Sequence, residues 1–349
     1  MLFRSFFDPT ATLANPLNIT IGQAAQPDPN GPFDISGRQW MDPDIKNAFV
    51  DQWNAGVEQQ LGSNTMMEVD YVGSRGMRIP VTPTLGAATV PGPGDPTLRE
   101  IFPYIAPSPN TVDWGRNWYN ALQATVRHNF SHGLSYSLAY TWSKSMDING
   151  NQQPYNLLHA EKAVGGNDFT HVLAIGGVYQ LPFGQTGSKL ATSSRAVNTI
   201  IGGWQLNGIL QGSSGTPYGV FFCGDIANLG RSDCYMRPNL VGNPSVSNPT
   251  LTGWFNTNAF ATPAQYTYGN EGRNILRGDG LVNLDLSLFR DIPIHERFKL
   301  QFRFETFNST NTVTWGNPVT QLGISGVTGH VYGTRSTERQ LQFAMKLYF

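Results

Sequence analysis

Long segments of this chain alternate strictly between apolar and polar residues. From residue 134 to 142 the even positions hold Leu, Tyr, Leu, Tyr and Trp, while Ser, Ala and Thr occupy the odd positions. A period of two places the two classes of side chain on opposite faces of a β-strand. We expect nine such strands, most of them nine or more residues long: 47–61, 65–73, 118–130, 134–142, 171–181, 204–213, 281–289, 297–308 and 339–349.

The length of these strands favours a sheet that crosses a membrane. Ordinary strands have roughly 5 to 6 residues, whereas tilted membrane-spanning strands need about 9 to 11. Trp118 and Trp142 lie near strand ends, where outer-membrane barrels carry aromatic girdles. Short connections such as 62–64 alternate with long ones such as 74–117, as periplasmic turns alternate with external loops in such barrels. A soluble sandwich with an aromatic core is the alternative.

Composition excludes several other classes of protein. Charged residues make up 13% of the chain and the formal net charge is −1, so there is no basic footprint for nucleic acid. The longest apolar runs fall short of the roughly 20 residues of a transmembrane helix, and the first ten residues do not resemble a signal peptide.

Barrel closure sets a condition on the strand count. Backbone groups in lipid must be paired within the protein, so a β-sheet crosses a bilayer only as a closed barrel. Nine antiparallel strands cannot close, and a further strand must come from residues 1–46, where 2–7 and 17–22 are weak candidates, or from sequence outside this chain. We therefore expect an all-β fold: an antiparallel transmembrane β-barrel, partial, with about 9 to 12 strands of a larger barrel and long external loops. Residues 1–46 form a loop and possible strand that lead into the barrel portion 47–349.

Six segments, in order, resemble TonB-dependent outer-membrane receptors of the Oar-like type, which carry a carboxypeptidase-regulatory-like domain. The first segment reads NAFVDQWNAGVEQQLGSNTMMEVDYVGSRG, and the others cover residues 117–147, 168–184, 202–218, 297–318 and 333–349. The resemblance implies a signal peptide, a small β-sandwich domain, a plug and a barrel of about 22 strands. This chain is then expected to be the C-terminal part of that barrel.

The resemblance also implies a function and partners. A bulky ligand would bind to the external loops and pass through the lumen when the TonB energy-coupling complex acts on a plug that is absent from this chain. Outer-membrane lipid surrounds the barrel, and the outer-membrane assembly machinery reads the C-terminal strand that ends in Phe349. The alternatives are a passive small barrel that acts as a pore or adhesin, and a soluble all-β carbohydrate-binding module.

The sequence contains few groups suited to catalysis or metal binding. Cys223 and Cys234 lie eleven residues apart in the longest loop. They could form a disulfide, remain two free thiols or contribute to a poor metal site. The histidines are scattered without ligand spacing, and no phosphate-binding, dinucleotide-binding or hydrolase motif is present. We expect no enzyme, no cofactor and no metal.

Two further groups of residues are candidates for ligand contact. Aromatic residues of the long loops could stack on sugar or peptide, or could pack the loops: Trp114, Tyr155, Phe221, Trp254, Tyr266 and Tyr268. Polar positions of two strands would line the lumen, either as structural wall or as ligand contacts: Asp285, Arg297, Lys299, Arg303 and Glu305.

Overall fold

In the computed structural model, nine long strands form one antiparallel sheet. The described residues are 41–101, 107–149, 152–156, 160–183, 194–295, 298–324 and 326–349. All nine expected strands are present: β1 (Phe49–Leu61), β2 (Thr65–Val81), β5 (Val112–Ser131), β6 (Leu134–Ile148), β8 (His171–Gln180), β9 (Trp204–Ser213), β14 (Leu281–His295), β15 (Phe298–Phe307) and β16 (Gln340–Tyr348). A short tenth strand, β7 (Lys162–Val164), pairs with β6. The weak strand candidates 2–7 and 17–22 lie outside the described residues.

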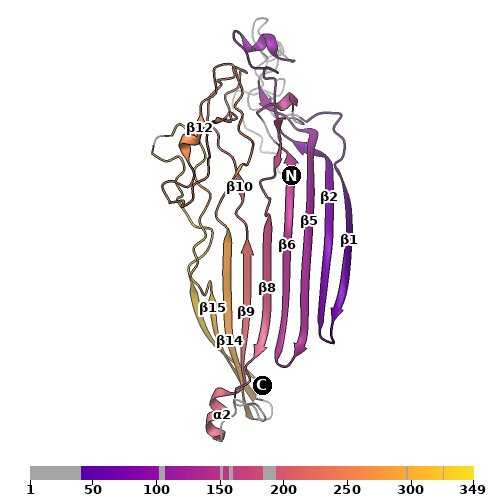
Figure 1. The fold of residues 1–349 in the computed structure, drawn as a ribbon, viewed down its shortest axis with the longest axis vertical. Coiled ribbons are helices and arrows are strands. Elements are labelled where there is room, and N and C mark those ends of the chain that lie inside the picture. The colour runs from indigo at the N-terminus through magenta and orange to yellow at the C-terminus, as the bar shows by residue number, and fades with distance from the viewer. Residues whose placement is uncertain are drawn as a thin grey trace, which may run out of the picture.

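The strands are ordered in space as they are in the chain, and each pairs antiparallel with the next. The sheet is tall and curved, with the long loops at one end and the C-terminus at the other (Figure 1). Among the described residues β1 pairs only with β2, and β16 only with β15. Because an odd number of strands alternates in direction, these two edge strands run the same way.

Cross-strand register separates an apolar face from a polar face. Leu138, Ile175, Leu210 and Leu284 are direct partners across β6, β8, β9 and β14. The adjacent row on the opposite face consists of Ala139, Ala174, Gln211 and Asn283. Directly paired residues share a face, so the alternation seen in single strands continues across the whole sheet. On the apolar face of β1, Val57 remains 71% exposed, since no other part of the described chain covers it.

Four strands continue well beyond the ends that alternation predicts, and the predicted boundaries are wrong at those points. β2 extends from 73 to Val81, β5 begins at Val112 instead of 118, β6 extends from 142 to Ile148, and β14 extends from 289 to His295. Near these ends the apolar pattern stops, but backbone pairing continues, with bulges between Gly76 and Val81. A strand that has left the hydrocarbon no longer needs an apolar face, so the pattern marks the membrane-spanning part and not the hydrogen-bonded length.

Three of the four connections at the C-terminal end are short, namely those between β1 and β2, β5 and β6, and β14 and β15. His132 and Gly133 form the two-residue turn between β5 and β6, and both have positive φ, 53° and 82°. This matches the type I′ turn that suits the twist of a hairpin. The longer connection between β8 and β9 contains helix α2 (Arg195–Ile201), where the Ser194 hydroxyl accepts a hydrogen bond from the Val197 N–H at 3.4 Å. Among the described residues, no helix is long and apolar enough to cross a membrane.

Both clusters of buried apolar side chains lie in the long loops, and only a few buried apolar residues, such as Ala121, lie in the long strands. The loops contain pairs of very short strands: β3 (Thr84–Leu85) with β4 (Ser108–Pro109), β10 (Pro217–Tyr218) with β13 (Leu276–Arg277), and β11 (Asn239–Leu240) with β12 (Phe260–Ala261). They also contain the 3-10 helices η1 (Pro96–Arg99), η2 (Pro154–Asn156) and η3 (Thr257–Ala259). The loops therefore pack as a folded layer above the sheet.

Candidate functional site

The four long connections form what we call the loop module, defined as the described residues of 82–111, 149–170, 214–280 and 308–339. They gather at the end of the sheet opposite the C-terminus (Figure 1). Long connections are external and short turns periplasmic in outer-membrane barrels, so the loop module faces the exterior. Two clusters of buried side chains support it: Ala87, Ala88, Phe222, Ala227, Leu229, Tyr235 and Met236 in the first, and Tyr218, Val220, Phe255, Ala259, Phe260 and Leu276 in the second.

Two ion pairs, each at least partly buried, attach segment 214–280 to β6 and to the loop that follows β6. Asp168 is 1% exposed, forms an ion pair with Arg277 and accepts a hydrogen bond from the backbone N–H of Ser145 at 2.5 Å. Arg273 pairs with Asp147 at the end of β6. A buried charge is costly unless it is paired and hydrogen-bonded, so these pairs define how segment 214–280 sits on β6 and on the loop that follows β6.

A disulfide and one carboxylate organise the tip of the longest loop. Cys223 and Cys234 form a disulfide. Between them, Asp225 accepts hydrogen bonds from the backbone N–H groups of Leu229 and Gly230, both at 2.7 Å, and from the hydroxyl of Tyr235 at 2.7 Å. Asp225 is thus occupied in holding the loop, and the described residues contain no group of three or more potential metal ligands.

The six aromatic loop candidates do not share one environment. Trp254 packs against the second cluster and Tyr268 against the first, and burial raises the pKa of Tyr268 to about 12. Tyr155 and Tyr266 are half-buried, as is Phe221, which forms a backbone bridge with Gln321. Trp114 lies in β5 and not in a loop, and is 38% exposed. Packing therefore accounts for Trp254 and Tyr268, and contact of any of the six with a ligand stays a prediction.

The polar face carries the expected lumen residues. Asp285 accepts hydrogen bonds from Asn283 Nδ2 at 3.0 Å and from the Asn308 N–H at 2.8 Å. Lys299 pairs with Asp291 at 2.5 Å. Arg303 donates to Gln301 Oε1 at 2.6 Å and lies 4.7 Å from the centre of the Phe289 ring, while Glu305 is opposite Ser287 in the register. Arg297 lies outside the described residues.

Most of these charges are therefore already engaged in contacts within the wall. Structural support is their observed role, and contact with a ligand stays a prediction.

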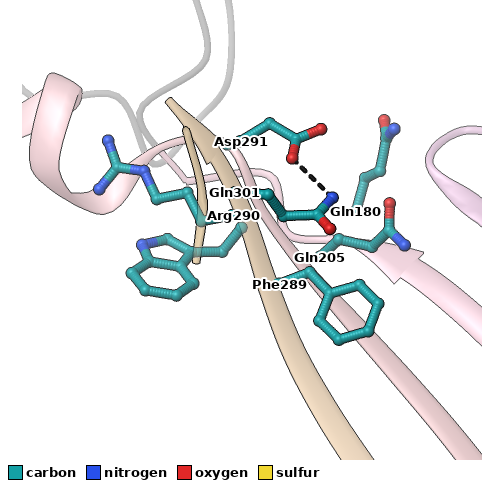
Figure 2. A pocket seen from close by; sticks show the side chains of 8 residues that line it. Gln180, Gln205, Phe289, Arg290, Asp291 and Gln301 are labelled. Carbon is teal, nitrogen blue, oxygen red and sulfur yellow. Dashed lines mark hydrogen bonds between the residues drawn. The ribbon is translucent and has the colours of Figure 1, made fainter. Parts of the chain in front are cut away.

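A small cavity of about 220 Å³ opens near the periplasmic end of this face. Figure 2 shows the side chains of Gln180, Gln205 and Gln301 around it, with Gln301 donating to Asp291 at 2.8 Å. These amides come from three different strands, β8, β9 and β15, so the pattern within any one strand does not predict that they meet. The sequence indicates only that each of them lies on the polar face of its strand.

Glu271 is a buried carboxyl that sequence reasoning missed. It is 2% exposed, and its Oε1 accepts a hydrogen bond from the Val220 N–H at 3.1 Å. Burial raises the pKa of Glu271 to about 7, although that hydrogen bond and the charge of Arg237 act in the opposite direction. No motif surrounds Glu271 in the sequence, and only the packing of distant loop segments makes it buried.

Phe349 ends the chain directly after β16 and is 92% exposed. Its role as an assembly signal stays a prediction.

Three solved structures illustrate the likeness of this chain to known proteins. They are the outer membrane transporter YddB from Escherichia coli (10% identity, TM-score 0.46, 88% of this chain and 33% of that chain), the ferric-catecholate import receptor Fiu from E. coli K12 (14%, 0.41, 87% and 28%), and FpvA of P. aeruginosa bound to pyoverdines (9%, 0.43, 87% and 27%). This chain thus spans about a third or less of their lengths. Comparison with curated proteins gave no match.

A family comparison covers nearly the whole chain. The family described as the outer membrane beta barrel domain matches residues 4–342. This match agrees with the antiparallel sheet, the separation of apolar and polar faces and the alternation of long loops and short turns. It confirms the expected fold class and location and disfavours a soluble carbohydrate-binding module. The chain belongs to the outer membrane β-barrel domain family and is a protein of the bacterial outer membrane.

Proposed function

We propose that this chain is the C-terminal part of the barrel of a TonB-dependent, Oar-like receptor, which binds a bulky ligand with its loop module and imports it. The observation that carries this proposal is the direction of the two edge strands. β1 and β16 run the same way, so they cannot pair antiparallel with each other. An odd number of additional strands is needed to close the sheet, which agrees with membership of a larger barrel.

The loop module supports a role in recognition. An external face built from its own apolar clusters, a disulfide and buried ion pairs is a rigid platform. Binding residues commonly lie on loops that a rigid scaffold positions. Oar-like type, energy coupling through a plug, and import are the specific parts of the proposal, and the ordered segments that resemble the family support them.

A gel-mobility experiment tests the barrel part of the proposal. The 349-residue chain is refolded in detergent micelles, and its mobility is compared before and after heating. We expect no heat-modifiable band, because the sheet cannot close without further strands. A compact band that disappears on heating, together with ion conductance in planar bilayers, would instead identify the passive small barrel.

Medium depletion tests the import part. In the source bacterium, one strain lacks the gene that encodes this chain and a second lacks the energy-coupling protein. We expect the same extracellular compound to remain in the medium of both mutants while the parent removes it. Depletion that is unchanged in the first mutant would refute import by this protein, whatever the outcome of the gel experiment.

A further inference from the structure

The apolar face of the sheet carries very few charges, and most of them are cations in one corner. Within the regularly paired stretches of the nine long strands and β7, cross-strand register places six charged residues on this face: Asp51, Arg75, Arg116, Lys144, Lys162 and Arg290. Five of the six are basic, and four of these five lie on the neighbouring strands β2, β5, β6 and β7. We call Arg75, Arg116, Lys144 and Lys162 the basic corner.

Register brings these four residues together. Arg116 is opposite Ile148, which is itself opposite Lys162. Arg75 is opposite Trp118, and Lys144 is opposite Asn120. Since paired residues of one face lie roughly 5 Å apart, the basic corner covers a few adjacent positions of a single surface.

The basic corner lies at the external edge of the membrane-spanning sheet. Arg116 is near the start of β5, and Lys144 is near the end of β6, both at the end that carries the loop module. Trp118 is on the same face, in the row between Arg116 and Lys144, and Trp142 lies one row beyond Lys144, nearer the centre of the membrane. Aromatic side chains form girdles at the level of the head groups, and long basic side chains reach from apolar surface to the polar interface.

In the part of the chain that the structure describes, these cations are left without a carboxylate partner. None of the four forms an ion pair with a carboxylate of the described residues, whereas Arg231, Arg237, Arg273, Arg277 and Lys299 all do so. Arg75, Lys144 and Lys162 are exposed. The Nζ of Lys162 lies 4.3 Å from the centre of the Trp118 ring, an arrangement that orients the ammonium group without cancelling its charge.

One acid and one further cation border the basic corner. Asp51 on the edge strand β1 lies opposite Arg75. Arg78, at the bulge of β2, has its guanidinium carbon 5.5 Å from the centre of the Phe49 ring. With both residues included, the net charge of this region stays positive.

We propose that the basic corner binds the phosphate groups of a phosphorylated lipid of the outer leaflet. Arg and Lys are the side chains that bind phosphate by charge-assisted hydrogen bonds, and Trp118 and Trp142 offer apolar contact for the part of the lipid below the phosphate. This site lies on the face opposite the lumen and is independent of the proposed import function.

Lipid titration of the protein tests this assignment. The full chain, extracted from the outer membrane in detergent, is titrated with diphosphorylated lipid A, and retained lipid is counted by native mass spectrometry. The variant R75Q/K144Q/K162Q is compared with the control R127Q/R339Q/K346Q, which removes the same charge from exposed positions of the polar face and a loop. We expect about a tenfold or greater loss of affinity in the first variant and about a twofold change or less in the control.

Further measurements keep the result interpretable. In the unaltered protein, lipid A without phosphates binds weakly, added salt weakens the binding of the diphosphorylated form, and inorganic phosphate at equal concentration does not compete. Equal binding of the two lipids, or equal loss in both variants, would overturn the proposal. Competition by inorganic phosphate would show that the site takes the free anion and not a lipid. If R75Q/K144Q/K162Q does not fold, the proposal is tested by the lipid comparison and the salt series on the unaltered protein and by the lipid affinity of the single variant K144Q.

Discussion

Glu271 links the stability of the loop module to pH. Its folded pKa of about 7 lies above the ordinary value of 4.5, so between these pH values the folded protein holds a proton that the unfolded chain releases. The free energy of unfolding therefore falls as pH rises through this window. Above pH 7 this decrease in the free energy of unfolding is complete, and it amounts to at most about 3 kcal/mol.

We expect Glu271→Gln to stabilise the loop module at pH 8 by up to about 3 kcal/mol and to have little effect near pH 4. The amide keeps an acceptor for the Val220 N–H and removes the buried negative charge. The stability of the loop module at each pH is measured from the urea dependence of proteolysis in segment 214–280. Glu338→Gln, at an exposed loop carboxylate, is the control. A gain that is equal at both pH values would contradict the assignment.

The disulfide between Cys223 and Cys234 closes a short loop at the exterior. We expect alkylation to change the protein mass only after reduction. Replacing both residues with Ser is expected to cost roughly 3 kcal/mol of loop-module stability, from the entropy of closing a loop of this length. Alkylation of the unreduced protein would show free thiols instead.

Two ion pairs, one within the loop module and one between β14 and β15, contribute differently to stability because they differ in burial. In the pair of Asp168 with Arg277, the carboxylate is 1% exposed, whereas in the pair of Asp291 with Lys299 both side chains are more than two-fifths exposed. We expect Asp168→Asn to destabilise the loop module by about 1 to 3 kcal/mol, because the exposed Arg277 and the Ser145 N–H lose a charged acceptor. Asp291→Asn should cost less than about 1 kcal/mol. Equal costs, measured by urea unfolding, would contradict this difference.

The two faces of a strand respond oppositely to charge. Leu210 lies between Ile175 and Leu284 on the apolar face, and its neighbour Gln211 is on the polar face. Near the middle of the bilayer, Leu210→Arg is expected to cost about 2 to 4 kcal/mol, whereas Gln211→Arg should change folding into vesicles little. If both variants insert equally well, the two faces have been assigned the wrong way round.

The open sheet as a whole makes a prediction about its two edges. In the 349-residue chain, a short bifunctional thiol reagent should not join Val57→Cys on β1 to Phe343→Cys on β16, because the proposed larger barrel has further strands between these two edges. The pair Val57→Cys and Val69→Cys, which are direct partners in the register, should be joined readily and serves as the control. A high yield for the first pair would mean that the chain closes on itself.

Much of the sheet could be predicted from the sequence, but little of the loop module could. Membrane-spanning strands show their two faces in every second residue, so β6, β15 and β16 are readable from local pattern alone. Their hydrogen-bonded ends are not readable, as the extension of β2 to Val81 shows. Asp168 and Arg277, more than 100 residues apart, have no local pattern that announces their pairing.

Sequence alone therefore determined the fold class, the number and order of the long strands and the two faces of the sheet, because lipid acts on each strand separately and residue by residue. Tertiary structure decided which loop carboxylates are buried, which aromatic residues pack inside the loop module, and that four cations from four strands share one surface. These properties depend on contacts between distant segments, and no local period in the sequence encodes such contacts.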